Sequence, residues 1–241
     1  MTGLPNGNKV VAGIDGCRAG WLCVTKDFST GDIVARILRR IDDVLHLNQK
    51  PAVVAVDIPI GLTDAGPRCC DLEARAKLGR PRASSVFPAP IRSMLDATTY
   101  QQACQIGLCV DGKKLSRQAW AILSKIHEVD IFMRSNTTLQ TWIYEVHPEV
   151  CFCVWNNNRA MQNSKKSSAG RTERENLVKP CYGQAYQAVQ NSLPRGQYAN
   201  DDLLDAFAAF WSAERILTNQ NIVLPANPPT DSCGLRMEMV A

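Results

Sequence analysis

The sequence predicts an α/β fold: a mixed five-stranded sheet flanked by helices, with a helical insertion in the middle of the chain. The first observation is a set of three strand-like segments, residues 9–15, 20–27 and 32–41, separated by short glycine-containing turns. This spacing is typical of an antiparallel meander. The second is an apolar run at 51–58, which follows a short helix expected at 42–48. A right-handed crossover would place this run beside the first strand and parallel to it.

Helical patterns dominate the middle of the chain and form the predicted insertion (66–135). We expect helices at about 67–78 and 97–107, and a longer one that Ser116 caps, whose apolar residues recur at the spacing of a packing stripe. Residues 79–93 are rich in Pro, Arg and Ser and are expected to form a long ordered loop. Loops of this length inside a domain are usually functional or disordered.

The last part of the chain completes the sheet. A fifth strand is expected at 141–146, followed by helices at 148–155, 171–178, 182–191 and 202–217 and a candidate edge strand at 235–240. The whole chain (1–241) is interpreted as one domain. Its parts are a βββαβ half at 9–62, the insertion, a region with the last core strand and helices at 141–219, a C-terminal tail at 220–241 and a loose N-terminal tail at 1–8.

Composition is that of an ordinary globular protein, because 45% of the residues are hydrophobic and 21% are charged. No apolar run approaches the ~18–20 residues of a membrane span, so no membrane partner is expected. The N-terminus lacks the apolar core of a signal peptide, which predicts a cytoplasmic protein. Among ten cysteines, the pairs Cys69/Cys70 and Cys151/Cys153 do not have zinc spacings, so reduced thiols are expected.

Positive charge is concentrated in the middle of the chain. The net charge is only +4, but residues 66–125 contain ten Lys and Arg against four Asp and Glu. A second basic cluster comprises Lys165, Lys166, Arg171 and Arg174. A solvated surface explains either cluster, and so does a site for a polyanionic ligand.

Two apolar runs each end in a single carboxylate. Asp15 ends the run at 10–15, and Asp57 ends the run at 53–57. Short β-branched runs are typical of buried strands, and ligand sites of open α/β sheets form at the carboxyl ends of strands. The alternative is that both residues belong to turns, since Asp15-Gly16 is a good turn dipeptide.

A second pair of carboxylates opens the last long helix. Asp202 and Asp205 are three residues apart and therefore share a helix face, which turns apolar immediately afterwards. Like charges at such a place require a cation to compensate them. Asp201 is interpreted as a first-turn residue favoured by the helix dipole, with Asn200 as the N-cap.

These acids together predict a metal site. Asp15, Asp57, Asp202 and Asp205 are the expected ligands, and the ion is Mg²⁺ or Mn²⁺, since both prefer hard oxygen ligands. Glu145 is a fifth candidate for catalysis, although a polar turn explains it equally well. His147, which precedes Pro148, is interpreted as structural.

The basic residues supply candidate contacts for substrate phosphates. Arginines of the basic loop and its flanks are suited to bind them, and Ser84 and Ser85 lie among these arginines. Lys125 is a further candidate, although a surface pair with Glu128 explains it too. The full set is Arg18, Arg75, Arg80, Ser85, Arg92, Lys125, Lys165 and Arg171.

Seven strings spread over nearly the whole chain carry a resemblance. They are GIDGCRAGW at 13–21, VDIPIGL at 56–62, SVFPAP at 85–90, LSRQA at 115–119, KIHEVD at 125–130, EVHPE at 145–149 and DDLLDA at 201–206. Together they resemble the uncharacterised family called domain of unknown function 429, regarded as predicted nucleases. The strand order and the acidic helix start also resemble the ribonuclease-H-like fold, and the chain's ending looks like that of bacterial Holliday-junction resolvases.

The resemblance implies a ribonuclease-H-like fold and suggests a metal-dependent nuclease, without supplying a substrate. One departure concerns the fourth strand, where the resolvases carry Glu and this chain carries Asp57. A side chain shorter by one methylene shifts the metal or leaves the bridging role to Glu145.

Three functions follow as hypotheses. The first is a Mg²⁺- or Mn²⁺-dependent phosphodiesterase that acts on DNA or RNA, with Asp15 bridging two ions. The second is a catalytically inactive binding module on the same scaffold, for nucleic acid or another partner. The third, a phosphotransferase related to sugar kinases, is disfavoured because that architecture needs two lobes and 241 residues are too few for them.

Overall fold

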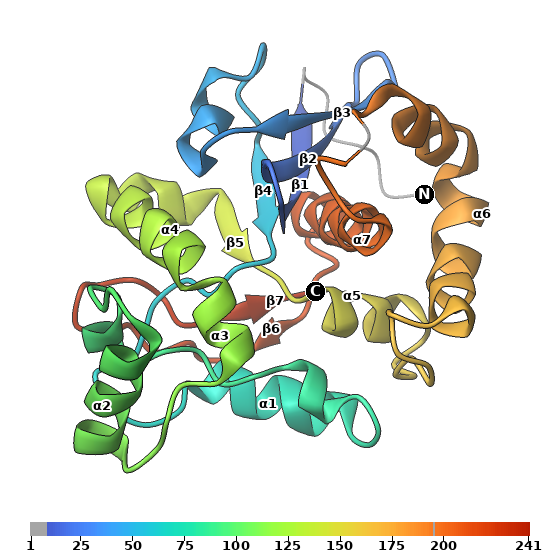
Figure 1. Ribbon diagram of the computed structural model, residues 1–241. Helices are drawn as coiled ribbons and strands as arrows, with labels where there is room; N and C mark the ends of the chain where they lie inside the picture. Colours follow the sequence, from blue (N-terminus) through green and yellow to red (C-terminus); the bar gives the residue numbers. More distant parts are fainter. Residues whose placement is uncertain (1–8, 195) are drawn as a thin grey trace.

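A mixed sheet of five strands forms the centre of the protein (Figure 1). The computed structural model describes residues 9–194 and 196–241, so the tail expected at 1–8 lies outside the described residues. The strand order is β3-β2-β1-β4-β5. The strands are β1 (Val10–Cys17), β2 (Gly20–Asp27), β3 (Ile33–Leu38), β4 (Val53–Val56) and β5 (Ile143–Glu145). The first three are antiparallel neighbours, whereas β1, β4 and β5 are parallel, which confirms the predicted ribonuclease-H-like arrangement.

β1 and β4 form the buried middle of this sheet. Val11, Ile14 and Val54 are fully buried, because helices cover both faces and β-branched side chains pack well on a pleated surface. Since β1, β4 and β5 run in the same direction, their carboxyl ends lie at one edge of the sheet. Asp15, Asp57 and Glu145 stand near or directly after these strand ends.

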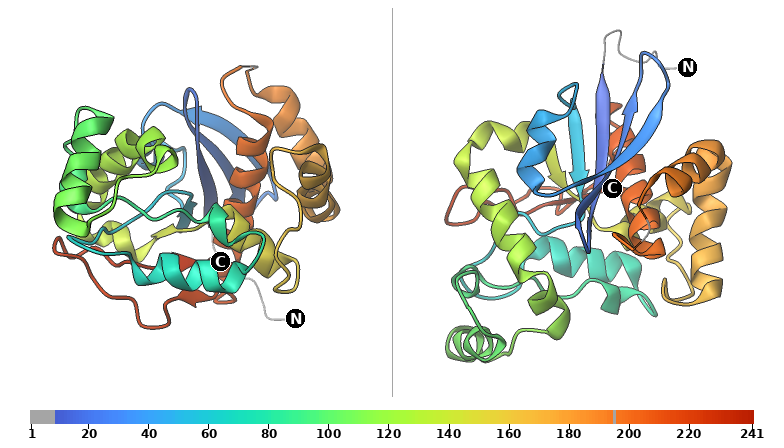
Figure 2. Two further views of the ribbon diagram at one scale, coloured as in Figure 1. Left: turned by 60° about the horizontal axis from the view of Figure 1, so that its bottom comes forward. Right: turned by 45° about the horizontal axis from the view of Figure 1, so that its top comes forward.

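Two layers of helices enclose the sheet (Figures 1 and 2). One face is covered by α7 (Asn200–Leu217), with α5 (Pro148–Trp155) and α6 (Ser168–Ser192) outside it. The opposite face is covered by α4 (Leu123–Ser135) and the short 3₁₀ helix η1 (Ile41–His46). Each face has its own hydrophobic core.

The helical insertion lies beyond the carboxyl ends of β1 and β4 (Figure 1). Its elements are α1 (Cys69–Leu78), η2 (Ala83–Ser85), η3 (Arg92–Met94), α2 (Tyr100–Asp111) and α3 (Arg117–Ala121). The single long helix expected from Ser116 is wrong, because the helix is interrupted at Ile122. Ala119 packs in a small core of the insertion, whereas Ile126 packs on the sheet. One apolar stripe therefore serves two cores.

One expectation about helix type is corrected. The crossover helix expected at 42–48 is the six-residue 3₁₀ helix η1, and 3₁₀ geometry is common in such short connecting helices. The two helices expected at 171–178 and 182–191 are confirmed as the two parts of α6, which are separated by a kink at Tyr182, just after Pro180.

The C-terminal strand does not join the central sheet. β7 (Met239–Val240) pairs with β6 (Val223–Leu224) in a separate two-stranded sheet. A further 3₁₀ helix, η4 (Thr137–Thr141), precedes β5. Over 9–194 and 196–241, none of the helices combines the length and apolarity that a membrane crossing needs.

Candidate functional site

Asp15 and Asp57 lie side by side where β1 and β4 end. Ile14 pairs with Val56 across the two parallel strands, and the backbone N–H of Asp57 donates to the carbonyl of Ile14 (2.9 Å). The next residue on each strand is the aspartate, so both side chains leave the sheet on the same face. Their carboxyl groups come within hydrogen-bonding reach of each other.

Helix α7 brings two more carboxylates to this point. Asp202 caps the helix, because its Oδ2 accepts a hydrogen bond from the backbone N–H of Ala199 (2.8 Å). The N-cap is therefore Ala199, one residue before the expected Asn200. Asp205, one turn later, is turned inward and is only 1% exposed.

A glycine lets α7 approach β1 closely enough for this contact. A Cβ at Gly13 would lie 2.0 Å from the backbone nitrogen of Phe210, so a side chain does not fit there. Absence of that Cβ explains how the acids of a helix and the acids of two strands come together.

We name these acids and the lysine inserted among them the strand-end cluster: Asp15, Asp57, Lys165, Asp202 and Asp205. Lys165 Nζ forms an ion pair with Asp205 Oδ2, and Asp205 also raises the pKa of this lysine. Burial and then the charges of Asp57 and Asp205 raise the pKa of Asp15, while Lys165 opposes the rise. Burial and Asp205 raise the pKa of Asp57 to about 7. One lysine therefore leaves the four acids undercompensated.

The donor set fits a divalent cation. All its ligand atoms are carboxylate oxygens, which suit Mg²⁺ and Mn²⁺. Asp205 Oδ1 is buried and, among the described residues, has no hydrogen-bond partner. A buried carboxylate oxygen without a partner is costly, and a cation would satisfy it while also balancing the excess charge.

Glu145 leaves its strand on the other face of the sheet, although its charge contributes to the raised pKa of Asp57. It pairs with Val56, so it shares a face with Val56 rather than with Asp57. Arg68 donates to both of its carboxylate oxygens (2.7 Å each), and the backbone N–H of Ile60 donates to Oε2 (2.6 Å).

We name the second group the Arg68 cluster: Arg68, Asp71 and Glu145. Ligand atoms of Cys70, Asp71 and Glu145 lie within 4.8 Å of one another, a spacing compatible with a metal. However, Arg68 also donates to both oxygens of Asp71, so its guanidinium already compensates the two acids. Burial raises the pKa of the Cys70 thiol, which disfavours the thiolate that a metal requires.

A cavity of about 460 Å³ opens onto the strand-end cluster. Seven of the residues singled out in the sequence line it: Asp15, Asp57, Ser85, Lys125, Glu145, Lys165 and Asp202. Asp205 lies behind Lys165, with which it pairs. The cavity therefore brings together residues from the ends of β1, β4 and β5, from α7 and α4, and from the basic loop.

The remaining predicted phosphate contacts lie elsewhere. Arg18 is in the exposed β1–β2 turn, and Arg80 is exposed at the end of α1. Arg75 donates to the carbonyl of Val86 and so holds the basic loop. Two others pair with acids away from the cavity: Arg92 with Asp130 (2.8 Å) and with Asp231, and Arg171 with Glu175 (3.0 Å).

The family model described as protein of unknown function (DUF429) matches residues 13–230. This chain belongs to the DUF429 family. The matched region includes every acid of the strand-end cluster. No curated protein and no solved structure shows a significant match to the chain.

Three residues of this DUF429 protein reach the site without having been singled out as functional in the sequence. Arg68 compensates the acids of its own cluster, as described above. Arg82 lines the cavity from the basic loop. His147 also lines it, and its Nδ1 is buried with no partner among the described residues. Burial and then Lys165 lower the pKa of His147 to about 4, so the ring is neutral near pH 7.

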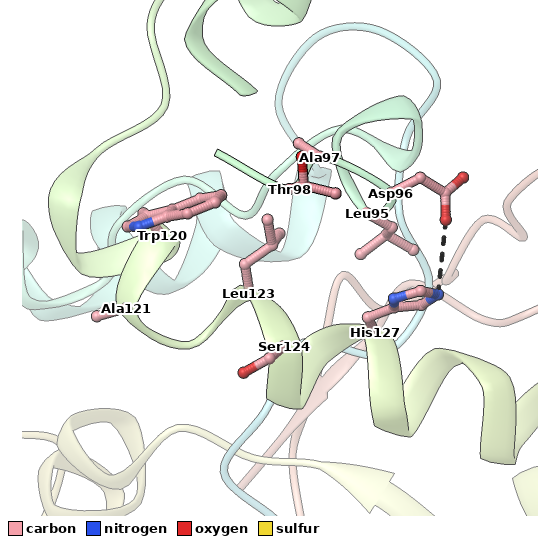
Figure 3. A pocket seen from close by; sticks show the side chains of 9 residues that line it. All are labelled: Leu95, Asp96, Ala97, Thr98, Trp120, Ala121, Leu123, Ser124 and His127. Carbon is pink, nitrogen blue, oxygen red and sulfur yellow. Dashed lines mark ion pairs between the residues drawn. The ribbon is translucent and has the colours of Figure 1, made fainter. Parts of the chain in front are cut away.

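The DUF429 chain has a second hollow, between the loop after η3 and the α3–α4 break (Figure 3). Trp120 and Leu123 form its apolar side, and His127 Nε2 lies 3.8 Å from Asp96 Oδ1 at its rim. The Asp96 side chain is 92% exposed, so this pair is solvated and weak. Asp96 is the acid among the residues that line this hollow, and none of the strand-end acids lines it.

Proposed function

We propose that this DUF429 protein is a Mg²⁺- or Mn²⁺-dependent phosphodiesterase that hydrolyses nucleic acid. The observation that carries the proposal is the strand-end cluster, in which four carboxylates share one lysine and three of the acids line the cavity. Such an excess of buried negative charge is unfavourable without a cation, and functional sites are where such costs persist. Asp15, Asp57, Asp202 and Asp205 are the residues that would hold the ion.

The bound ion would polarise a phosphoryl oxygen and lower the pKa of a water molecule. The residues of the chain have separate tasks. The charges of the other strand acid and of both helix acids act on Asp15, so it joins the two parts of the site. His147 lines the cavity, and because its ring is neutral near pH 7, one of its two nitrogens is a hydrogen-bond acceptor. Lys125 adds a positive charge, held by the carbonyl of Gly20 (2.6 Å).

Nucleic acid is proposed as the substrate because basic residues and acids meet in one cavity. Phosphodiester hydrolysis needs both an ion held by carboxylates and cations that attract the phosphate. The test is to incubate the protein with single-stranded, double-stranded and branched DNA and RNA, with Mg²⁺, Mn²⁺ or EDTA. Metal-dependent cleavage is expected, and Asp15→Asn should reduce its rate by at least about a hundredfold with the fold intact.

The matched control is Asp32→Asn in the exposed β2–β3 turn, which should cleave at the wild-type rate. Absence of cleavage with every substrate and both ions would overturn the proposal. Equal cleavage by Asp15→Asn would show that the activity arises elsewhere.

One observation favours the second candidate, an inactive nucleic-acid-binding module. Lys165 places an ammonium group among the acids, where a metal would lie. Mn²⁺ titration of wild type and Lys165→Met, followed by electron paramagnetic resonance, separates the two candidates. If the protein is a phosphodiesterase, the wild type should itself bind Mn²⁺. If only Lys165→Met binds Mn²⁺, the lysine has replaced the metal and the binding module is favoured.

A further inference from the structure

The cavity has the size of a small-molecule site. Its volume of about 460 Å³ lies within the roughly 300–1,000 Å³ of pockets that enclose a single ligand. Asp15 at its floor is only 7% exposed. A stacked, paired strand cannot bring its backbone to a buried floor, and enzymes with such sites take one nucleotide out of the stack. A free nucleotide or one unit of a single strand meets this requirement.

Charges in the cavity wall are of two kinds, paired and free. Arg68 is paired within its own cluster, and Lys166 Nζ pairs with Asp201 (2.6 Å). Arg82, in contrast, forms no ion pair or side-chain hydrogen bond within 9–194 and 196–241, and its Nε is buried without a partner. A guanidinium left without an acid at a cavity wall is suited to bind an anion, because its fork matches phosphate oxygens.

The free charges are also separated by sign. Asp15 and Asp57 stand at the strand ends and have Lys165 beside them, whereas Arg82 belongs to the basic loop; Lys125 of α4 also lines the cavity, with its Nζ donating to the Gly20 carbonyl. Phosphate cannot lie against carboxylates alone, since the like charges repel. It can lie between an ion held by the acids and a guanidinium. An aromatic ring on which a nucleotide base could stack is also present, because Phe87 lines the same cavity and is only partly buried.

We propose that the cavity binds one nucleoside phosphate unit at a time, with its phosphate held by Arg82 and its base on the apolar wall that includes Phe87. The proposal rests on the proposed phosphodiesterase function and narrows its substrate to free nucleotides and unpaired strands. Arg82 is then the phosphate-binding arginine of the basic loop. Duplex DNA or RNA would be excluded unless one nucleotide leaves the stack.

The first experiment measures binding without any bond to cleave. Thymidine 5′-monophosphate and thymidine are titrated into the full chain by calorimetry, with EDTA and with Mn²⁺. Thymidine 5′-monophosphate should bind wild type, and Arg82→Ala should weaken it by about tenfold or more while changing thymidine binding by about twofold at most. Arg39→Ala, an exposed arginine outside the cavity, should change neither by more than about twofold.

Arg82→Lys keeps the positive charge, so it serves as a control in case the alanine variant is misfolded. It should recover part of the affinity lost in Arg82→Ala. Equal binding of the nucleotide by wild type and Arg82→Ala would overturn the phosphate assignment, and so would nucleotide binding no tighter than thymidine binding.

The second experiment compares initial cleavage rates on a single-stranded oligonucleotide and on a blunt hairpin duplex of the same length. The single strand should be cleaved at least about tenfold faster. Equal cleavage within the paired stem would overturn the single-unit cavity. Nucleotide binding that depends on Arg82 without cleavage of any strand supports the subsite and contradicts hydrolysis. Cleavage that is unaffected in Arg82→Ala supports hydrolysis and contradicts the subsite.

Discussion

The strand-end cluster and the Arg68 cluster line the same cavity at one edge of the sheet, yet the acids of the two clusters are compensated differently. In the Arg68 cluster, one guanidinium donates to two carboxylates, and a backbone N–H satisfies a further oxygen. In the strand-end cluster, four carboxylates share one ammonium group, and an oxygen of Asp205 has no partner among the described residues. The satisfied cluster stabilises the fold, whereas the unsatisfied one is ready for a ligand.

The largest expected effect comes from breaking the satisfied cluster. Arg68→Ala leaves Glu145 and Asp71 buried without their cation, which should lower the free energy of unfolding by about 3–5 kcal/mol. Urea unfolding followed by circular dichroism measures it. Arg39→Ala, on the exposed surface, should stay within about 0.5 kcal/mol. A loss below about 1 kcal/mol for Arg68→Ala would contradict a stabilising role.

Metal should act on the other cluster. At pH 8, Mn²⁺ at a hundred times its dissociation constant should raise the free energy of unfolding by about 2.7 kcal/mol, because only the folded state assembles the four acids. Thermal unfolding measures the shift. Asp15→Asn should lose it, and Glu145→Gln should keep it relative to its own metal-free value. The reverse pattern would assign the metal to the Arg68 cluster.

Gly13→Ala should disturb one cluster and spare the other. The new Cβ would meet the Phe210 backbone at 2.0 Å and push α7 away from β1, so we expect a loss of about 1–3 kcal/mol together with weaker Mn²⁺ binding. Gly183→Ala in α6 meets no atom within 4 Å and should be neutral or stabilising. Unchanged Mn²⁺ affinity in Gly13→Ala would show that the position of α7 does not govern the site.

The smallest expected effect is a pH dependence. The folded-state pKa of Asp57 is raised to about 7, above its ordinary value of 3.8, so the folded protein holds this proton more tightly than the unfolded chain. Stability from Asp57 is therefore present at low pH and is lost as pH rises between about 4 and 7. Without metal, wild type should lose roughly 1–2 kcal/mol relative to Asp57→Asn over this range, a reduced figure because Asp15 shares the charge.

Equilibrium unfolding at pH 4.5 and 8 gives that difference, and Asp32→Asn serves as the comparison variant. A difference between wild type and Asp57→Asn that does not change with pH would show that Asp57 titrates normally.

The sequence allowed a prediction of which acids come together where the signal is local. Asp15 and Asp57 are each the single charge of an apolar run and stand at its end, and parallel strands bring such ends to one edge of a sheet. Asp202 and Asp205 are three residues apart on one helix, so their shared face follows from helical geometry. These four positions needed no knowledge of distant contacts.

The sequence could not predict the orientation or the ion pair of a side chain where a residue far away in the chain determines it. Glu145 ends a strand just as the aspartates do, but a register that pairs it with Val56 turns it to the other face. A shift by one residue would reverse that face, and the sequence does not specify the register. Similarly, Arg92 is 139 residues from Asp231, so its ion pair could not be inferred from neighbours.

The sequence by itself determined the α/β sheet, the four aspartates and the basic loop, because each depends on periodicity or charge within a few residues. Only the tertiary structure decided which cations remain free. It pairs Arg68 and Arg92 with acids, leaves Arg82 at the cavity wall and inserts Lys165 among the aspartates. The physical reason is that an ion pair depends on distance in space, and segments far apart in the chain set that distance.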